Sequence, residues 1–196
     1  LHKFYMSNHD YVIIDSKFSK EQNLLLYNQV CKNKMFSEKE HLKNNSHEKS
    51  ESSIFGRRTD TNFHKQQINE VDELISWIET SLIEASKNFS LNSITKQPSN
   101  QFDPNDFEIR QCWGATYKGH EWLMEHNHFP WTLSFVYYVS MPKGASGLMM
   151  GDDEIEMYEG DCIFFLGSQY HGVRPSHTMN DTRCVIAGNI LYVPRI

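Results

Sequence analysis

The chain has 196 residues, a net charge of −6 at neutral pH and an isoelectric point near 5.9. This acidic balance argues against electrostatic binding of nucleic acid, which needs clustered Lys and Arg side chains. No apolar run approaches the ~18 residues that cross a bilayer, and the N-terminus has no apolar signal segment. We therefore expect one cytoplasmic domain over residues 1–196, without a nucleic-acid or membrane partner.

The cysteines are widely separated and form no CxxC pair; they are Cys31, Cys112, Cys162 and Cys184. Scattered cysteines within apolar strand patterns are more typical of buried free thiols than of a disulfide framework. Free thiols agree with the reducing cytosol.

The first hundred residues predict helical support and a long loop. Residues 11–14 have an apolar strand pattern, and Ser19 with Gln22 has the form of a capping box that opens a helix. We expect this helix to end near Asn33. Its apolar residues are Leu24, Leu25, Tyr27 and Val30.

Residues 37–67 are polar and have no periodicity, which is typical of a long loop. The exceptions are Phe55, Gly56, Arg57, Arg58 and Phe63. Two interpretations are open: the segment folds over a pocket, or it is a solvated loop. If the chain binds a substrate, we expect contacts from this segment, with Arg57 and Arg58 as the candidates.

The clearest helix covers residues 68–89, where apolar side chains recur at steps of three and four. This stripe comprises Ile68, Val71, Ile75, Ile78, Leu82, Ala85 and Phe89. We expect the helix to pack across a sheet and assign it no chemistry.

From residue 107 the chain reads as short strands separated by tight turns. The expected strands are residues 107–117, 133–140, 147–150, 154–158, 161–166, 171–174 and 183–193. Helices followed by many strands predict an α+β fold with a barrel or jelly roll at its centre. We expect residues 107–193 to form this core and residues 1–100 to support it.

Three histidines predict a metal site. His126 and His128 are two residues apart, so on a strand both side chains would point to the same face. His171 follows a strongly apolar strand pattern and lies on a different strand. Imidazole is a common ligand of iron, zinc and copper, and three ligands leave coordination positions open. Arg183 begins the last strand and is suited to binding a carboxylate through two parallel hydrogen bonds.

These residues belong to an ordered set of motifs over roughly half of the chain. The set is Tyr117 with Gly119, His126-x-His128, Tyr137-Tyr138, Glu159-Gly-Asp-x-Ile-Phe-Phe165, His171-x-Val173 and Arg183. It resembles the Fe(II)- and 2-oxoglutarate-dependent oxygenase superfamily, and it is most similar to a bacterial and phage branch with an HxH motif. The resemblance implies a prolyl-hydroxylase-like double-stranded β-helix flanked by N-terminal helices.

The resemblance also implies a role for each site residue. His126 matches the first iron ligand, His171 the distal histidine, and Arg183 the arginine that binds the C5 carboxylate of the cosubstrate 2-oxoglutarate. Tyr138 and Tyr117 match tyrosines that reach the arginine or the cosubstrate. The implied activity is that of a dioxygenase, which hydroxylates a peptidyl or small-molecule substrate and releases succinate and CO2.

Position 128 departs from the family pattern, which usually has Asp or Glu there. We expect His128 to be the third ligand, with Glu121, Glu125 or Asp152 as alternatives. Three neutral imidazoles would leave the iron with its full positive charge, which a dianionic cosubstrate would balance.

Two other classes of protein remain open. One is a cupin-like enzyme with three histidine ligands that does not use 2-oxoglutarate, for example a zinc enzyme. The other is a non-catalytic β-sandwich binding module with structural histidines.

Several site residues also have a structural alternative. Arg183 could form an ion pair with Asp161 or Asp181, and Tyr117 and Tyr138 could be core aromatics. Aromatic residues beside the histidine pair could line a pocket or simply pack; they are Trp122, Phe129 and Trp131. We expect three others to be barrel core: Trp113, Phe164 and Phe165. The remaining histidines are expected to be surface or core residues: His2, His9, His41, His47, His64, His120 and His177.

Overall fold

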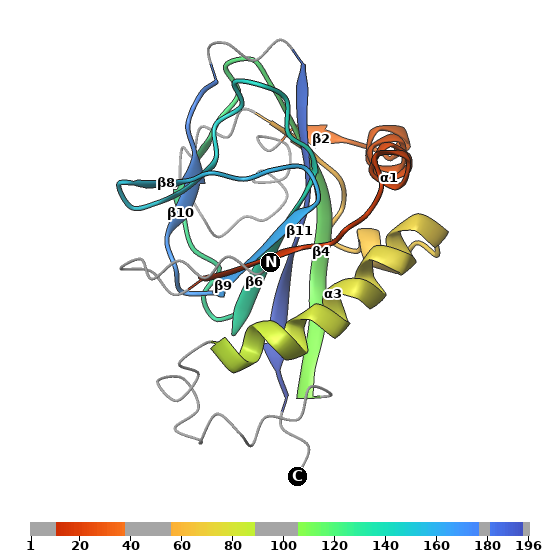
Figure 1. Cartoon of the computed structure of the whole chain (residues 1–196), viewed down its shortest axis with the longest axis vertical. Helices are drawn as coiled ribbons and strands as arrows, with labels where there is room; N and C mark the ends of the chain where they lie inside the picture. The colour runs from red at the N-terminus through yellow and green to blue at the C-terminus, as the bar shows by residue number, and fades with distance from the viewer. Residues whose placement is uncertain (1–10, 38–55, 89–105, 177–180, 194–196) are drawn as a thin grey trace.

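The computed structural model describes residues 11–37, 56–88, 106–176 and 181–193 (Figure 1). Its helical elements are α1 (Lys20–Lys32), the 3-10 turn η1 (Phe63–Lys65) and α3 (Asn69–Asn88). Its strands are β1 (Tyr11–Asp15), β2 (Phe36–Ser37), β3 (Arg57–Arg58), β4 (Phe107–Lys118), β5 (Leu123–His126), β6 (Leu133–Ser140), β7 (Leu148–Met150), β8 (Asp153–Ile155), β9 (Asp161–Leu166), β10 (His171–Val173) and β11 (Thr182–Tyr192).

The strands form two sheets that face each other. The larger sheet has seven strands in the order β1-β9-β6-β11-β4-β3-β2, and the smaller has four in the order β5-β10-β7-β8. In both sheets the paired strands are antiparallel. Both helices lie on the side of the larger sheet that faces away from the smaller sheet (Figure 1). The predicted α+β jelly-roll architecture is therefore confirmed.

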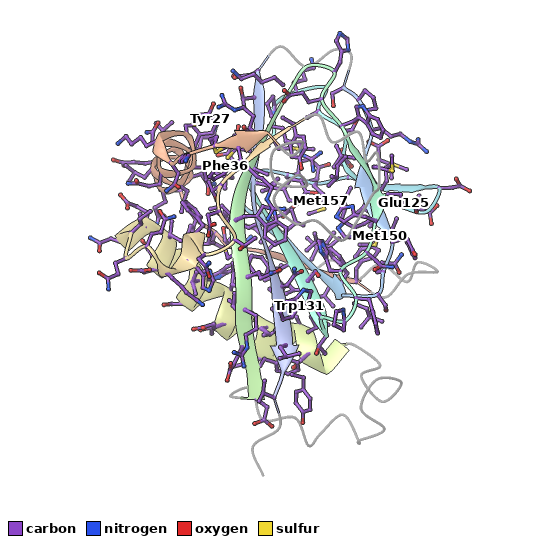
Figure 2. All side chains as sticks on the ribbon, turned by 180° about the vertical axis from the view of Figure 1, so that it is seen from behind. Tyr27, Phe36, Glu125, Trp131, Met150 and Met157 are labelled. Atoms are coloured by element: carbon purple, nitrogen blue, oxygen red, sulfur yellow. The ribbon has the colours of Figure 1, made fainter. Side chains whose placement is uncertain are left out.

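The larger sheet is buried on both faces. One cluster of apolar residues lies between the sheet and the helices, and a second lies between the two sheets. In Figure 2, Met150 and Met157 lie among the side chains that fill the space between the sheets, while Tyr27 lies on the helix side. A strand with two buried faces has no need of polar residues at every second position. This explains why residues 135–139 of β6 are all apolar or aromatic.

Helix α1 begins as the sequence predicts, but it packs through a different face. The Ser19 side chain accepts a hydrogen bond from the Gln22 backbone at 3.2 Å, and the Gln22 side chain accepts one from the Ser19 backbone at 2.9 Å. Leu24 and Leu25, expected to pack, are 58% and 42% exposed. The buried face comprises Asn23, Leu26 and Val30.

Two contacts explain this choice of face. Asn23 Oδ1 accepts a 2.6 Å hydrogen bond from the Tyr137 hydroxyl, which fixes a polar residue against the sheet. Val30 packs over Gly114 of β4, where an added Cβ would lie only 2.6 Å from the valine side chain. The helix therefore approaches the sheet at a glycine, which an apolar-periodicity argument cannot detect.

Helix α3 buries the predicted apolar stripe, except that Leu74 takes the place of Ile75. Its buried residues include Val71, Leu74, Ile78, Leu82 and Ala85, whereas Ile75 is only half-buried. The expected stripe residue Phe89 lies outside the described residues. The helix runs diagonally across the larger sheet, as predicted (Figure 1).

Residues from the first hundred also supply strands. Strand β3 lies in the segment expected to be a loop, of which residues 38–55 are not described, and β2 ends at the first residue of that segment. Strand β5 was not expected, and the strand predicted for 154–158 is β8, which ends at Ile155.

Two expectations from composition can be compared with the described residues. Of the free cysteines, Cys112, Cys162 and Cys184 are buried and Cys31 is exposed. In the described part of the chain, no helix is both long and apolar enough to cross a membrane.

Candidate metal centre and buried arginine

The three predicted histidines converge on one point. His126 is the last residue of β5 and pairs in register with His171, the first residue of β10. Their ring centroids are 4.4 Å apart, and the ring of His128 lies 4.9 Å from His126 and 5.0 Å from His171. One possible ligand atom from each residue lies within 4.8 Å of the other two.

His128 reaches this point by a different route from the one expected. Strand β5 ends at His126, so His128 is not on the same strand. Its backbone N–H instead donates a 2.7 Å hydrogen bond to the carbonyl of Gly167, which precedes β10. The turn after β5 is thereby tied to the segment that leads to His171.

Backbone carbonyls orient two of the three rings. Nδ1 of His126 lies 2.9 Å from the carbonyl of Met124, and Nδ1 of His171 lies 3.0 Å from the carbonyl of Gln169. A carbonyl only accepts, so these contacts assign the proton to Nδ1 and the lone pair to Nε2. Fixing the tautomer and the ring in this way is how metal-binding histidines are commonly held.

All three imidazoles are neutral near pH 7. Burial lowers the pKa of His128 to about 2 and that of His171 to about 3, and it also lowers the pKa of His126. The positive charge of Arg58 lowers the pKa of His126 and His128 further. Only the neutral ring can donate a lone pair to a metal, so the site is ready to bind one without first losing protons.

Among the described residues, no carboxylate joins this cluster. Glu121 accepts a 2.6 Å hydrogen bond from the Lys118 backbone in its own turn. Glu125 and Asp152 are exposed. The three histidines could therefore bind a metal ion, and imidazole donors suit iron, zinc and copper.

A cavity between the sheets connects the histidines with Arg183. The cavity and its mouth enclose about 440 Å³ of empty space, part of which is open to solvent. His126, His128 and His171 line it together with Tyr117 and Arg183. The other lining residues are mostly apolar.

Arg183 is buried without a counter-ion. It is 2% exposed and lies close to two tyrosine rings, with Cζ 5.4 Å from the ring centroid of Tyr117 and 5.3 Å from that of Tyr138. Its Nη2 donates a 3.4 Å hydrogen bond to the Tyr138 hydroxyl. No described residue accepts a hydrogen bond from its Nε or Nη1.

The alternative of an ion pair at Arg183 does not fit these contacts. Asp161 accepts a hydrogen bond from the Tyr158 backbone, and Asp181 accepts one from the Thr182 backbone. Strand register instead places Arg183 directly opposite Tyr117.

Two groups at this site were missed by sequence reasoning. Trp113, expected to be core, lines the cavity, and the Arg58 guanidinium lies 4.5 Å from its ring centroid. Gln111, Asn189 and Ser134 form a polar row on the cavity side of β4, β11 and β6, joined by hydrogen bonds of 2.8 and 2.9 Å. Their only sequence signal was a polar residue within an apolar strand.

The aromatics beside the histidine pair do not line the cavity. Phe129 is 77% exposed, and Trp122 and Trp131 are half-buried outside the lining. The turn that carries His128 therefore exposes the Phe129 side chain.

Comparison of the whole chain with known proteins gives a structural match but no sequence match. No protein-family model matches the chain, and no curated protein is significantly similar to it. The viral collagen prolyl hydroxylase of Paramecium bursaria Chlorella virus-1 is 17% identical with a TM-score of 0.60, covering 93% of this chain and 96% of its own. A prolyl-4-hydroxylase of Pseudomonas putida is 14% identical with a TM-score of 0.58, covering 95% of both chains.

The chain has the fold of the 2-oxoglutarate- and Fe(II)-dependent oxygenases. The resemblance expected from the motifs is thus confirmed for the fold, and the oxygenase fold covers more than residues 107–193. HygX of Streptomyces hygroscopicus, solved with nickel and 2-oxoglutarate bound, is 10% identical with a TM-score of 0.60, covering 93% of this chain and 82% of its own.

Proposed function

We propose that this protein is an Fe(II)- and 2-oxoglutarate-dependent dioxygenase that hydroxylates a peptidyl or small-molecule substrate. In the overall reaction, one oxygen atom of O2 enters the new hydroxyl group and the other enters succinate, with loss of CO2. One observation carries the proposal: a buried arginine with two unsatisfied donors shares a cavity with three neutral histidines.

The argument from Arg183 is electrostatic. A guanidinium removed from water without an anionic partner is strongly destabilising. Arg183 makes one long hydrogen bond to a neutral hydroxyl, which compensates little of this cost. A carboxylate that accepts from Nη2 together with either Nη1 or Nε would bind in the bidentate geometry that arginine favours, and it would satisfy one of the two donor nitrogens that no described residue reaches. We assign this position to the C5 carboxylate of 2-oxoglutarate.

The tyrosines would position this arginine. Tyr138 is fully buried, and its hydroxyl accepts a hydrogen bond from Nη2, which would hold the guanidinium in place for the ligand. The centroid of the Tyr117 ring lies 5.4 Å from the guanidinium carbon. Both contacts restrict the side chain before any ligand binds, which reduces the entropy lost on binding.

The metal would be held by His126, His128 and His171. When bound, Fe(II) supplies the redox chemistry that couples oxidative decarboxylation of the cosubstrate to hydroxylation of a C–H bond. The protein's own contribution is to fix the rings through the carbonyls of Met124 and Gln169 and to keep water out with apolar walls.

The three-histidine donor set gives a specific expectation for the cosubstrate. Three neutral ligands leave the iron dication uncompensated, so a dianionic cosubstrate is favoured more than in a site with a carboxylate ligand. This distinguishes the proposed enzyme from a zinc enzyme with three histidines, which would need only water in its open position.

The test is anaerobic spectroscopy combined with product analysis. The wild-type protein with Fe(II) should develop a weak visible absorption band when 2-oxoglutarate is added under argon, and should release succinate when oxygen is admitted. Arg183→Met should retain iron but lose the band, whereas Arg110→Met, an exposed arginine on β4, should behave as wild type. A wild-type protein that binds iron but shows no band would contradict the proposal and favour the cupin-like alternative.

A further inference from the structure

A row of three polar side chains crosses the larger sheet at one end of the cavity. Ser134 of β6, Asn189 of β11 and Gln111 of β4 lie side by side, because Asn189 pairs in register with both of the others. The Ser134 hydroxyl donates to Asn189 Oδ1 at 2.9 Å, and Asn189 Nδ2 donates to Gln111 Oε1 at 2.8 Å. Ser134 is 1% exposed and Asn189 is 2% exposed, so both are withdrawn from bulk water.

This polar row and Arg183 mark opposite ends of the cavity. On β11, Asn189 lies six positions after Arg183 (183 to 189), and a rise of ~3.3 Å per residue places them roughly 20 Å apart along the strand. Val185 and Ala187, which lie between them on the same strand, line the cavity. Arg183 lines it at one end and Ser134 at the other.

The metal centre lies close to the polar row. Trp113 is two positions after Gln111 on β4, and its ring centroid lies 5.8 Å from that of His128. The histidines therefore meet the larger sheet one side-chain step, about 7 Å along the strand, from the row. In the proposed complex the cosubstrate extends from Arg183 to the metal, so the cavity wall at Ser134 is left for the primary substrate.

The order of the hydrogen bonds within the row decides which group Ser134 can bind. A hydroxyl has one proton and two lone pairs, and the proton of Ser134 is used on Asn189. In the described part of the chain, no further residue bonds to this hydroxyl. Ser134 therefore offers the cavity a buried hydrogen-bond acceptor. Such an acceptor binds an N–H or O–H group and disfavours a carboxylate, which has no proton to donate.

The surroundings of Ser134 favour a donor without charge. The row contains no ionisable side chain, and the wall beside it is apolar, with Val136, Phe165 and Ala187 among the lining residues. An ionised substrate group would lose its water there without gaining a counter-ion. In the proposed complex the dianionic cosubstrate balances the iron, so the positive charge of Arg183 remains and further disfavours an ammonium group.

We propose that Ser134, held by Asn189 and Gln111, accepts a hydrogen bond from an uncharged donor of the primary substrate and thereby fixes the substrate beside the metal centre. The inference rests on the proposed function and names its substrate class: a molecule with a neutral N–H or O–H group close to the C–H bond that is hydroxylated. The donor is either the N–H of an amide or the hydroxyl of an alcohol, and both present the same proton to Ser134.

The experiment compares Ser134→Ala and Ser134→Cys with Ser86→Ala. Ser86 is a buried serine of α3 whose hydroxyl donates to the Ile83 carbonyl at 2.9 Å, so it controls for the loss of any buried hydroxyl. Cysteine is close to serine in size and keeps a weaker acceptor, so this variant tests the role of Ser134 even if alanine disturbs the fold.

Two sets of probes distinguish the two kinds of donor. The first set is N-acetyl amino acid methylamides against their N-methylated analogues, and the second is methyl hexosides against their monodeoxy analogues. One readout is the change that each probe causes in the anaerobic Fe(II)–2-oxoglutarate band. The other is succinate release above the rate without probe.

We expect at least one donor probe to alter the band and to stimulate succinate release, with the analogue that lacks the donor about tenfold weaker. Ser134→Ala should raise the KM for that probe about tenfold, and Ser134→Cys should raise it less, while the affinity for 2-oxoglutarate stays unchanged. In Ser134→Ala the probe and its analogue should become equal, because the group that tells them apart is gone. Ser86→Ala should leave all these values unchanged. Stimulation by a methylamide identifies an amide donor, and stimulation by a hexoside identifies an alcohol.

Three results would overturn the inference: no donor probe has an effect, a probe and its donor-free analogue act equally on the wild type, or the Ser134 variants keep the wild-type KM. Its failure is separable from failure of the proposed function. If the wild type forms no band with Fe(II) and 2-oxoglutarate, the proposed function itself fails. If the band forms normally and one of the three results is obtained, only the role of Ser134 is wrong.

Discussion

The two faces of the larger sheet use similar residues for different purposes. Tyr137 and Tyr138 are adjacent in β6 and both are fully buried, but they point to opposite faces. On the helix side, the Tyr137 hydroxyl donates to Asn23 at 2.6 Å and lies 3.1 Å from the Ser16 hydroxyl. On the cavity side, the Tyr138 hydroxyl accepts one 3.4 Å hydrogen bond from Arg183.

This difference separates stability from function within one strand. The Tyr137 hydroxyl on the helix side is paired at short distances, as expected where a polar group serves the fold. The cavity side keeps two donors of a buried cation unsatisfied. Substitutions on the two faces should therefore affect different measurements.

The largest effect should come from removing a histidine on the cavity side. His126→Ala takes away one of three candidate ligands, so iron binding and the anaerobic band should both be lost. The metal-free protein should keep its melting temperature within a few degrees, because the imidazole contributes little to the apolar core. Metal analysis and thermal denaturation would measure both quantities, with the exposed His120→Ala as control. Full iron content in His126→Ala would refute the assigned ligand set.

The next largest effect should be at Arg183. Replacement by Met should weaken 2-oxoglutarate binding about 100-fold, because a desolvated charge pair is lost. The melting temperature of the ligand-free protein should rise, since an uncompensated buried charge is removed. Titration of the iron-loaded protein and calorimetry of the ligand-free protein test the two parts. A lower melting temperature would show that the guanidinium stabilises the fold and does not serve a ligand.

The folding stability of the metal-free protein should depend on pH through the histidines on the cavity side. The folded-state pKa values of His128 and His171, about 2 and about 3, lie below the value of 6.5 for an unperturbed histidine. Between these values the unfolded chain binds protons that the folded chain does not, so stability falls as the pH drops below about 6.5. Denaturant unfolding at several pH values should show a shallower decline in His128→Asn. An identical decline in this variant would exclude His128 as a source of the effect.

The smallest effects should come from replacing the two tyrosines, and these two variants compare the two faces of the sheet most directly. Tyr137→Phe leaves Asn23 without its donor and should cost about 1–3 kcal/mol of folding free energy. Tyr138→Phe removes only a long hydrogen bond, so stability should be unchanged and 2-oxoglutarate binding should weaken a few-fold. Chemical denaturation and cosubstrate titration of both variants test this. Equal destabilisation by both substitutions would contradict the distinction between the faces.

Sequence reasoning was effective where a signal is local. The capping box of α1, the stripe of α3 and the positions of most strands from 107 onward depend on spacing within a few residues. The histidine pair and Arg183 stood out because their side chains are chemically distinctive at those positions.

It failed where partners are distant in the chain. The buried face of α1 was wrong because Gly114 and Tyr137, both far along the sequence, determine it. Strand β5 was missed because its pairing with β10 is irregular between His171 and Val173, which disturbs the alternation of side chains. The place of Arg58 depends on a two-residue strand that lies between β4 and the equally short β2.

The placement of the site on both sheets has a mechanical consequence. His126 and His171 belong to the smaller sheet, while Arg183, Tyr117 and Tyr138 belong to the larger. Under the proposed function, a single cosubstrate molecule would tie the two sheets together, one end on each. Because that molecule is cleaved in every turnover, the link between the sheets would be lost and formed again in each catalytic cycle. Resistance to proteolysis should then rise and fall with the supply of 2-oxoglutarate.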